Sequence, residues 1–293
     1  MREKCATRLF EAPVVQAAQR ALGDAGGAWI VGGAVRDAVL GAEVDDLDLA
    51  VAGDPGAAAK AIAAELGEHA FELSAEFGTW RVAARDHGAQ VDVTTLRGEG
   101  IEDDLGERYF TIGAVAVPLA GGEPIDPYRG LADLDRRVLR AVGPGSFAAD
   151  PLRLLRAARL AAELDLQVDP DTAALARAAA ARAADPAGER QLAELRQLLG
   201  GPAPLRGLAL LDELELTAVV LPEVEQLRGV EQGPNHHLDV HGHTLAVLEH
   251  TLEVEADLER FAGERGEEVA ALLAEPLADE LDRRTALRFG ALF

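Results

Sequence analysis

The chain has 293 residues, 48% of them hydrophobic, and a formal net charge of −23 at pH 7. At roughly 150 residues per domain, this length predicts about two domains. The negative charge argues against non-specific affinity for nucleic acid but leaves room for a local basic groove. No apolar run is long enough to span a bilayer, so no membrane association is expected. The single cysteine, Cys5, and the lack of an apolar leader favour a reducing, cytoplasmic location.

Strands and helices alternate in the first part of the chain. The pattern predicts strands at Ala28–Val31, Asp46–Ala52, Phe71–Leu73, Trp80–Ala84 and Gln90–Leu96. It predicts helices over Ala34–Leu40 and from the N-cap Asp54 to Leu66, with Gly67 as the stop. The alternation indicates an α/β domain that ends near Val142.

The second part of the chain has the apolar spacing of helices. Helices are predicted at Asp150–Leu164, Asp171–Ala184, Glu189–Leu199 and Pro204–Leu214, and helical character continues to the end. The segment from Tyr128 to Arg159 contains seven Arg and three Asp, whereas Glu249–Asp282 contains twelve acidic residues and two Arg. The chain stops at Phe293 inside an apolar run without a cap, which favours a truncated sequence.

Asp46 and Asp48 lie two residues apart in a predicted strand, so their side chains share one face of it. Two neighbouring carboxylates repel each other unless a cation joins them, and Mg²⁺ prefers such oxygen ligands. Taken alone, the pair fits a solvated strand face better than a metal site.

Gly32 and Gly33 follow a strand and precede a helix, where backbone N–H groups can face an anion. Alone they also fit an ordinary tight turn. Gly-Gly-x-Val-Arg-Asp followed by Asp-x-Asp on the next strand is more specific, and it indicates a triphosphate held between amides and metal. Asp92 is the candidate third carboxylate of a two-metal clamp, although an edge-strand acid fits it equally well.

These motifs resemble those of the class II tRNA nucleotidyltransferase and bacterial poly(A) polymerase family. The likeness continues in order through Glu107–Ala116, Ile125–Leu134, Ala149–Ala161 and Glu189–Leu195. Five ordered motifs rarely arise by chance. The resemblance implies an α+β fold: a polymerase-β-like head with a mixed sheet and helices, followed by an all-α neck and body.

The resemblance also implies a role for each matching residue. Asp46 and Asp48 would bind catalytic Mg²⁺ beside Asp92. On the predicted neck helix, Asp150 and the Arg residues spaced by three would read the base of CTP or ATP. The expected nucleotide-binding residues are Gly32, Gly33, Arg36, Arg108, Asp150, Arg153, Arg156 and Arg159. The implied reaction is in-line attack of the tRNA 3′-hydroxyl on an α-phosphate, with release of pyrophosphate.

Several positions depart from the family pattern. Glu107 and Tyr109 stand where the family has Arg and Asp, Gly113 replaces an Asn, and Ala149 replaces a Glu. The first of these regions is associated in the family with choosing ribose over deoxyribose. CCA, CC-only, A-only and poly(A) addition all share these motifs, and a non-catalytic RNA-binding relative is a further alternative.

Four histidines stand within eight residues at His236, His237, His241 and His243. The segment resembles the start of an HD-type phosphohydrolase domain, in which His243 would be the first metal ligand. No His-Asp pair follows before Phe293, so a polar loop before a helix is the preferred interpretation, and phosphohydrolysis is a rival only for a longer form.

The sequence therefore predicts three parts: a catalytic head over 1–142, a base-reading and RNA-binding neck over 143–203, and a helical body over 204–293 running into an incomplete HD domain. The expected partners are tRNA, ATP and CTP, with Mg²⁺ as cofactor and no protein partner.

Overall fold

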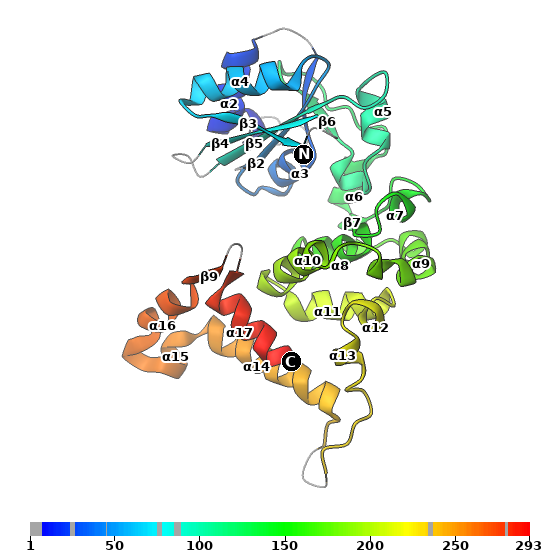
Figure 1. Ribbon diagram of the computed structural model, residues 1–293, viewed down its shortest axis with the longest axis vertical. Helices are drawn as coiled ribbons and strands as arrows, with labels where there is room; N and C mark the ends of the chain where they lie inside the picture. The colour runs from blue at the N-terminus through cyan, green and yellow to red at the C-terminus, as the bar shows by residue number, and fades with distance from the viewer. Residues whose placement is uncertain are drawn as a thin grey trace. The chain divides into compact units, whose positions relative to one another are not determined.

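The computed structural model describes residues 8–23, 27–44, 46–74, 78–84, 89–233, 237–278 and 281–293. The chain forms two compact units, Met1–Ser146 and Phe147–Phe293. The first unit is a mixed sheet with helices and the second is mainly helical (Figure 1), so the expected fold class is confirmed. The finer division of the second unit into neck and body stays a prediction. No helix of the described residues is long and apolar enough to cross a membrane.

The first unit contains one six-stranded sheet among its described residues, in the order β3-β4-β5-β2-β1-β6. The strands are β1 (Ala28–Val31), β2 (Asp46–Val51), β3 (Ala70–Ser74), β4 (Thr79–Ala84), β5 (Ala89–Thr95) and β6 (Ala116–Pro118). β2 and β5 are parallel, and the other neighbours pair antiparallel. The five strands that the sequence predicted match β1 to β5 within about two residues at each end.

Two helices cover one face of this sheet, α2 (Pro13–Leu22) and α4 (Pro55–Leu66), which lie together on one side of it in Figure 1. Their apolar residues share a core with Leu47, Leu49 and Val91 from the sheet. Asp54 caps α4 as predicted, because its carboxylate accepts hydrogen bonds from the backbone N–H groups of the first turn.

The opposite face carries the alternate side chains of the same strands. α5 (Ile101–Gly106) covers its β1–β2–β6 part through a second core that contains Val31, Ala50 and Leu105. The remaining elements of this unit are α3 (Gly33–Leu40), η2 (Thr111–Gly113), α6 (Gly130–Asp135) and β7 (Val138–Leu139). Short helices such as α5 and α6 were not predicted, because fewer than two turns leave little apolar periodicity to detect.

The second unit is built from helices around α8 (Arg153–Glu163) and α10 (Gly188–Gly200). The other elements are α9 (Pro170–Ala178), η3 (Ala180–Ala184), α11 (Pro204–Glu213), α12 (Thr217–Val220), α13 (Pro222–Glu225), α14 (Val240–Ala256), α15 (Leu258–Ala262), η4 (Gly263–Arg265), α16 (Gly266–Leu273) and α17 (Arg283–Leu292), with α7 (Ser146–Ala149) at its start and the short strand β8 (Gln167–Val168).

Three predictions for this unit are wrong in detail. The helix expected from Asp150 begins at Arg153, because Asp150 instead accepts the N–H of Leu152 in a tight turn. The helix expected over Asp171–Ala184 is α9 followed by the 3₁₀ turn η3, two conformations that a run of alanines does not distinguish. The helical character that was expected to continue to the end is interrupted by the hairpin of β9 (Pro276–Ala278) and β10 (Leu281–Asp282).

The histidine segment is described only in part. His236 lies outside the described residues. His237 precedes α14, and His241 and His243 lie in its first turn, which Asp239 caps through the N–H of Gly242.

Candidate functional site

The register of the sheet places the predicted carboxylates on one face. Asp48 of β2 lies directly beside Asp92 of β5 in the parallel pairing, and Asp46 lies one pleat away on the same side. Leu47 and Leu49 are buried on the opposite face, while Asp46 is exposed and Asp48 is half-buried. The shared face that the two-residue spacing predicted is therefore present, and Asp92 lies on it as well.

The glycine corner after β1 meets this carboxylate row. Gly32 has a φ of 71°, and a Cβ added to it would lie 2.7 Å from Asp48 Oδ2 and 3.2 Å from Arg108 Nη1. The backbone N–H of Gly33 acts to lower the pKa of the Asp48 carboxyl. The glycine corner, Asp48 and Arg108 therefore converge at one place. Only a residue without a side chain fits there.

Negative charge is in excess here. Burial raises the pKa of Asp48 above its usual value, and the nearby charges of Asp92 and Asp46 raise it further, against the lowering effect of Arg108. Among the described residues, no three His, Cys, Asp or Glu side chains form a metal-binding group. Mg²⁺ commonly uses only one or two carboxylates and completes its shell with water and substrate phosphate. The Asp46–Asp48 pair therefore fits such an ion.

Asp92 has a partner that the sequence reading missed. Arg81 of β4 donates from Nε to Asp92 Oδ1 and from Nη2 to Oδ2, both at 2.8 Å. The two residues are directly paired across the antiparallel strands. The sequence did show opposite charges, Arg81 and Asp92, on two predicted neighbouring strands. The pairing register that places them opposite each other could not be known from the sequence.

The two arginines expected to contact a triphosphate are also held by carboxylates. Arg36 donates to both oxygens of Asp37, at 2.7 and 2.9 Å. Arg108 donates to Oδ2 of the buried Asp104, at 3.1 and 3.2 Å. Both arginine side chains are about one-fifth exposed, so they keep some access to solvent.

The remaining predicted residues lie in the second unit, on α8 or just before it, and three of them, Asp150, Arg156 and Arg159, pair with side chains of α10. Asp150 Oδ2 accepts from Arg190 Nη2 at 2.9 Å. Burial works to raise the pKa of Asp150, but the hydrogen bonds from Arg190 and from the Leu152 N–H outweigh it and hold that pKa below its usual range. Arg153 begins α8 one turn before Arg156.

Arg156 and Arg159 converge on one acid from α10. Glu194 accepts from Arg156 Nε at 2.5 Å and from Arg159 Nε at 2.8 Å. Its side chain is only 6% exposed. These arginines therefore tie α8 to α10, a function that their spacing by three did not reveal.

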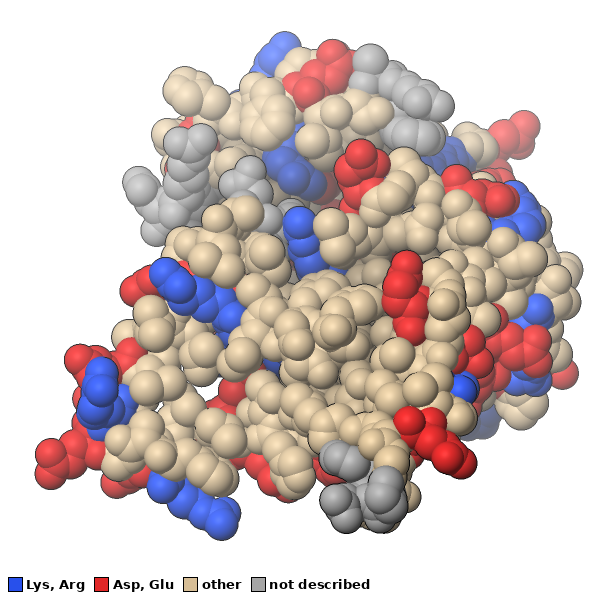
Figure 2. All heavy atoms as spheres, turned by 60° about the horizontal axis from the view of Figure 1, so that its bottom comes forward, with Lys and Arg blue, Asp and Glu red and all other residues tan. Residues whose placement is uncertain are grey.

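Ion pairing also changes the expected charge distribution. Arg140 in the first unit pairs with Asp133, and Arg156 and Arg159 pair with Glu194, so much of the basic middle segment is locally neutralised. Figure 2 shows acidic and basic side chains interspersed on the face that it presents.

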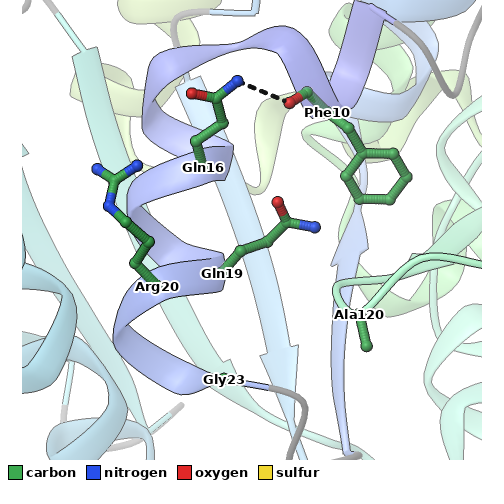
Figure 3. A pocket seen from close by; sticks show the side chains of 6 residues that line it. All are labelled: Phe10, Gln16, Gln19, Arg20, Gly23 and Ala120. Carbon is green, nitrogen blue, oxygen red and sulfur yellow. Dashed lines mark hydrogen bonds between the residues drawn. The ribbon is translucent and has the colours of Figure 1, made fainter.

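A separate pocket of about 480 Å³ lies at α2 in the first unit. Figure 3 shows its lining side chains, among them Gln16, Gln19 and Arg20. Gln16 Nε2 donates to the Phe10 carbonyl, and Gln19 Nε2 donates to the Leu119 carbonyl. None of the predicted site residues lines this pocket, and α2 packs on the sheet face opposite the carboxylates.

Comparison with protein families matches two segments of the chain. Residues 28–140 match the poly A polymerase head domain. Residues 165–227 match a family described as the probable RNA and SrmB-binding site of polymerase A. The first match contains the carboxylates and the glycine corner, and the second contains Arg190 and Glu194.

Curated relatives have similar sequences over much of the chain. It is 42% identical over 231 residues to an A-adding tRNA nucleotidyltransferase of Deinococcus radiodurans, covering 77% of this chain and 52% of that protein. It is 44% identical over 176 residues to a CC-adding tRNA nucleotidyltransferase of Geobacter sulfurreducens, covering 60% and 41%. The chain thus spans about half the length of these relatives.

Solved structures resemble the fold over nearly the whole chain. One is a tRNA nucleotidyltransferase complexed with a primer tRNA and an incoming ATP analog, with a TM-score of 0.69, 27% identity and coverage of 94% of this chain and 79% of that one. Another is a tRNA-processing enzyme with CTP, with a TM-score of 0.67, 28% identity and coverage of 93% and 72%.

Proposed function

We propose that this chain, which belongs to the family of class II tRNA nucleotidyltransferases and bacterial poly(A) polymerases, adds C or A nucleotides to the 3′ end of tRNA and releases pyrophosphate. The observation that carries the proposal is the convergence of Asp48, Gly32 and Arg108, with Asp92 beside Asp48 in register. The relatives named for A addition and for CC addition support both nucleotides as substrates.

The head residues supply binding and positioning for this reaction. Asp46 and Asp48 would hold Mg²⁺, which when bound lowers the pKa of the attacking hydroxyl and neutralises phosphate charge. Gly32 and Gly33 leave the backbone open to an incoming triphosphate, and Arg36 and Arg108 would pair with its oxygens. Most of the rate enhancement would come from this positioning and electrostatic stabilisation.

The helical unit would select the base. The Asp150 carboxylate can accept from an exocyclic amine of cytosine or adenine, and Arg153 can donate to a ring acceptor. Arg190 keeps Asp150 ionised through their hydrogen bond, and an ionised carboxylate is the form that accepts. Arg156 and Arg159 would then act mainly as the anchors that hold α8 in place against Glu194.

The test is nucleotide incorporation into tRNAs that lack the 3′ CCA, that end after CC or that end after CCA, with Mg²⁺ and labelled CTP or ATP. Incorporation of CTP alone indicates CC addition, and incorporation of ATP alone into CC-ended tRNA indicates A addition. Incorporation of CTP and then ATP indicates CCA addition, and long adenosine tracts indicate poly(A) addition. Asp46→Ala/Asp48→Ala should abolish incorporation while tRNA binding persists in a filter assay.

The departures at Tyr109 and Gly113 keep one alternative in view, a relative that binds RNA without turnover. Tight tRNA binding by the unaltered chain without incorporation of either nucleotide would favour that alternative and refute the proposal. Hydrolysis of 2′,3′-cyclic phosphates with a divalent transition metal, seen only for a longer form of the chain, would indicate an HD domain.

A further inference from the structure

A single cross-strand row connects the candidate metal site to the edge of the sheet. Asp48 on β2 pairs with Asp92 on β5, Asp92 pairs with Arg81 on β4, and Arg81 pairs with Phe71 on β3. Residues directly opposite each other on paired strands project from the same face. The guanidinium of Arg81 is therefore in the same layer as the carboxylates, one strand beyond Asp92.

Arg81 engages both oxygens of Asp92 in a planar two-bond contact. The two side chains are 29% and 18% exposed, so water screens the pair only partly. Gln90 Nε2 lies 3.4 Å from Asp92 Oδ2 and adds a weak third donor. Both carboxylate oxygens of Asp92 therefore already accept hydrogen bonds from protein donors.

The charge of Arg81 also reaches the other two carboxylates. The hydrogen bonds with Asp92, and the charges of Asp92, Asp46 and Asp48, raise the pKa of Arg81 against the opposing effect of burial, so it stays protonated. Three acids on one half-buried face would repel one another without such a cation. The face therefore already contains a positive charge before any metal arrives.

We propose that Arg81 is an internal counterion of the metal site, a positioning residue that neutralises Asp92 in the metal-free chain and weakens divalent-cation binding at Asp46 and Asp48. The inference rests on the metal site of the proposed function. A fixed positive charge one strand beyond Asp92 opposes the binding of a divalent ion at Asp46 and Asp48, and the two-bond contact keeps Asp92 from turning toward that ion.

The proposal predicts tighter metal binding when the charge is removed. Mn²⁺, titrated into the metal-free chain and followed by the EPR signal of the free ion, should bind Arg81→Gln with a dissociation constant lowered about fivefold or more. Arg81→Lys keeps the charge but not the planar fork, and it should bind Mn²⁺ close to the wild-type affinity.

Thermal unfolding provides a second readout. In metal-free buffer Arg81→Gln should have a lower Tm than the wild type, and saturating Mn²⁺ should raise its Tm by more than it raises that of the wild type. A merely structural role for Arg81 would lower the metal-free Tm but leave the metal-induced rise unchanged.

Two controls separate the possible failures. Arg20→Gln removes an arginine that pairs with Glu65 on the opposite side of the sheet, and it should change neither the Mn²⁺ affinity nor the metal-induced rise in Tm. Asp48→Asn should abolish Mn²⁺ binding. Unchanged or weaker Mn²⁺ binding by Arg81→Gln overturns the counterion role alone, whereas wild-type binding by Asp48→Asn overturns the metal site and both proposals with it.

Discussion

The two units position their candidate residues in different ways. In the first unit, Asp46, Asp48 and Asp92 project from one face because of strand alternation and register, which are properties of the backbone. In the second unit, Asp150, Arg156 and Arg159 are held by side chains of α10, namely Arg190 and Glu194. A site built on sheet register depends on backbone shape, whereas one built between helices depends on ion pairs.

This difference predicts where each site is vulnerable. Adding a single methyl group at the glycine corner should damage the first site, because there the backbone and a carboxylate are in contact. Removing a charge from α10 should damage the second site, because there the contacts are between charged side chains.

Among substitutions that leave the carboxylates in place, Gly32→Ala should have the largest effect on activity. The new Cβ would lie 2.7 Å from Asp48 Oδ2, so the carboxylate must move, and alanine is strained at a φ of 71°. A displacement of about 1 Å at a reacting centre lowers the rate roughly 100-fold. Single-turnover incorporation of CTP or ATP under saturating tRNA measures the loss.

Gly23→Ala is the matched control for backbone strain. Gly23 has a φ of 64° at the end of α2, but an added Cβ there meets no atom within 4 Å. It should lower the Tm through backbone strain alone, by no more than Gly32→Ala does, while leaving incorporation intact. Equal loss of activity in the two variants would mean that contact with Asp48 is irrelevant.

Glu194→Gln should have the largest effect on the stability of the second unit. The substitution preserves shape but removes the charge that accepts from Arg156 and Arg159. Hydrogen bonds to charged groups contribute about 1.5–3 kcal/mol each. The amide oxygen of Gln keeps one of the two acceptors, so the free energy of unfolding should fall by about 1.5–3 kcal/mol, the contribution of one such bond. Urea unfolding followed by circular dichroism measures it.

Glu163→Gln provides the comparison on the same arginine. Glu163 accepts from Arg159 Nη1 at 2.8 Å, but its side chain is 41% exposed. The free energy of unfolding should fall by at most about 1 kcal/mol, as it does when a surface ion pair is removed. If both variants lose the same small amount, burial of Glu194 does not strengthen its ion pairs.

Asp150 should produce a small dependence of stability on pH. Its pKa is lowered in the folded chain, so its contribution is present above the unfolded value of about 3.9 and is lost as pH falls through the lower folded value. The wild type should be more stable than Asp150→Asn near neutral pH, by about 1 kcal/mol or less because both partners are partly exposed.

Urea unfolding at a series of pH values down to about 3 tests this dependence. The difference in free energy of unfolding between the wild type and Asp150→Asn should shrink below the ordinary Asp pKa of about 3.9. Arg190→Gln removes the partner and should reduce the same pH dependence. A difference in free energy of unfolding that stays constant over the whole pH range would show that the Asp150–Arg190 pair does not stabilise the folded chain.

Local patterns were enough to predict most of the first unit. Strands β1 to β5, the cap Asp54 and the common face of Asp46 and Asp48 were all predicted from neighbours within a few residues. The start of α8 was wrong because Asp150 bonds to the Leu152 N–H, a choice between turn and helix that periodicity does not resolve.

The sequence by itself determined the alternation of carboxylate and leucine along β2 and the presence of glycine at the corner, because strand period and backbone freedom act within a few residues. Only the tertiary structure decided that Arg81 binds Asp92 and that Glu194 joins Arg156 to Arg159. These partners are 11, 38 and 35 residues apart, and such contacts form only after strand register and helix packing bring them together.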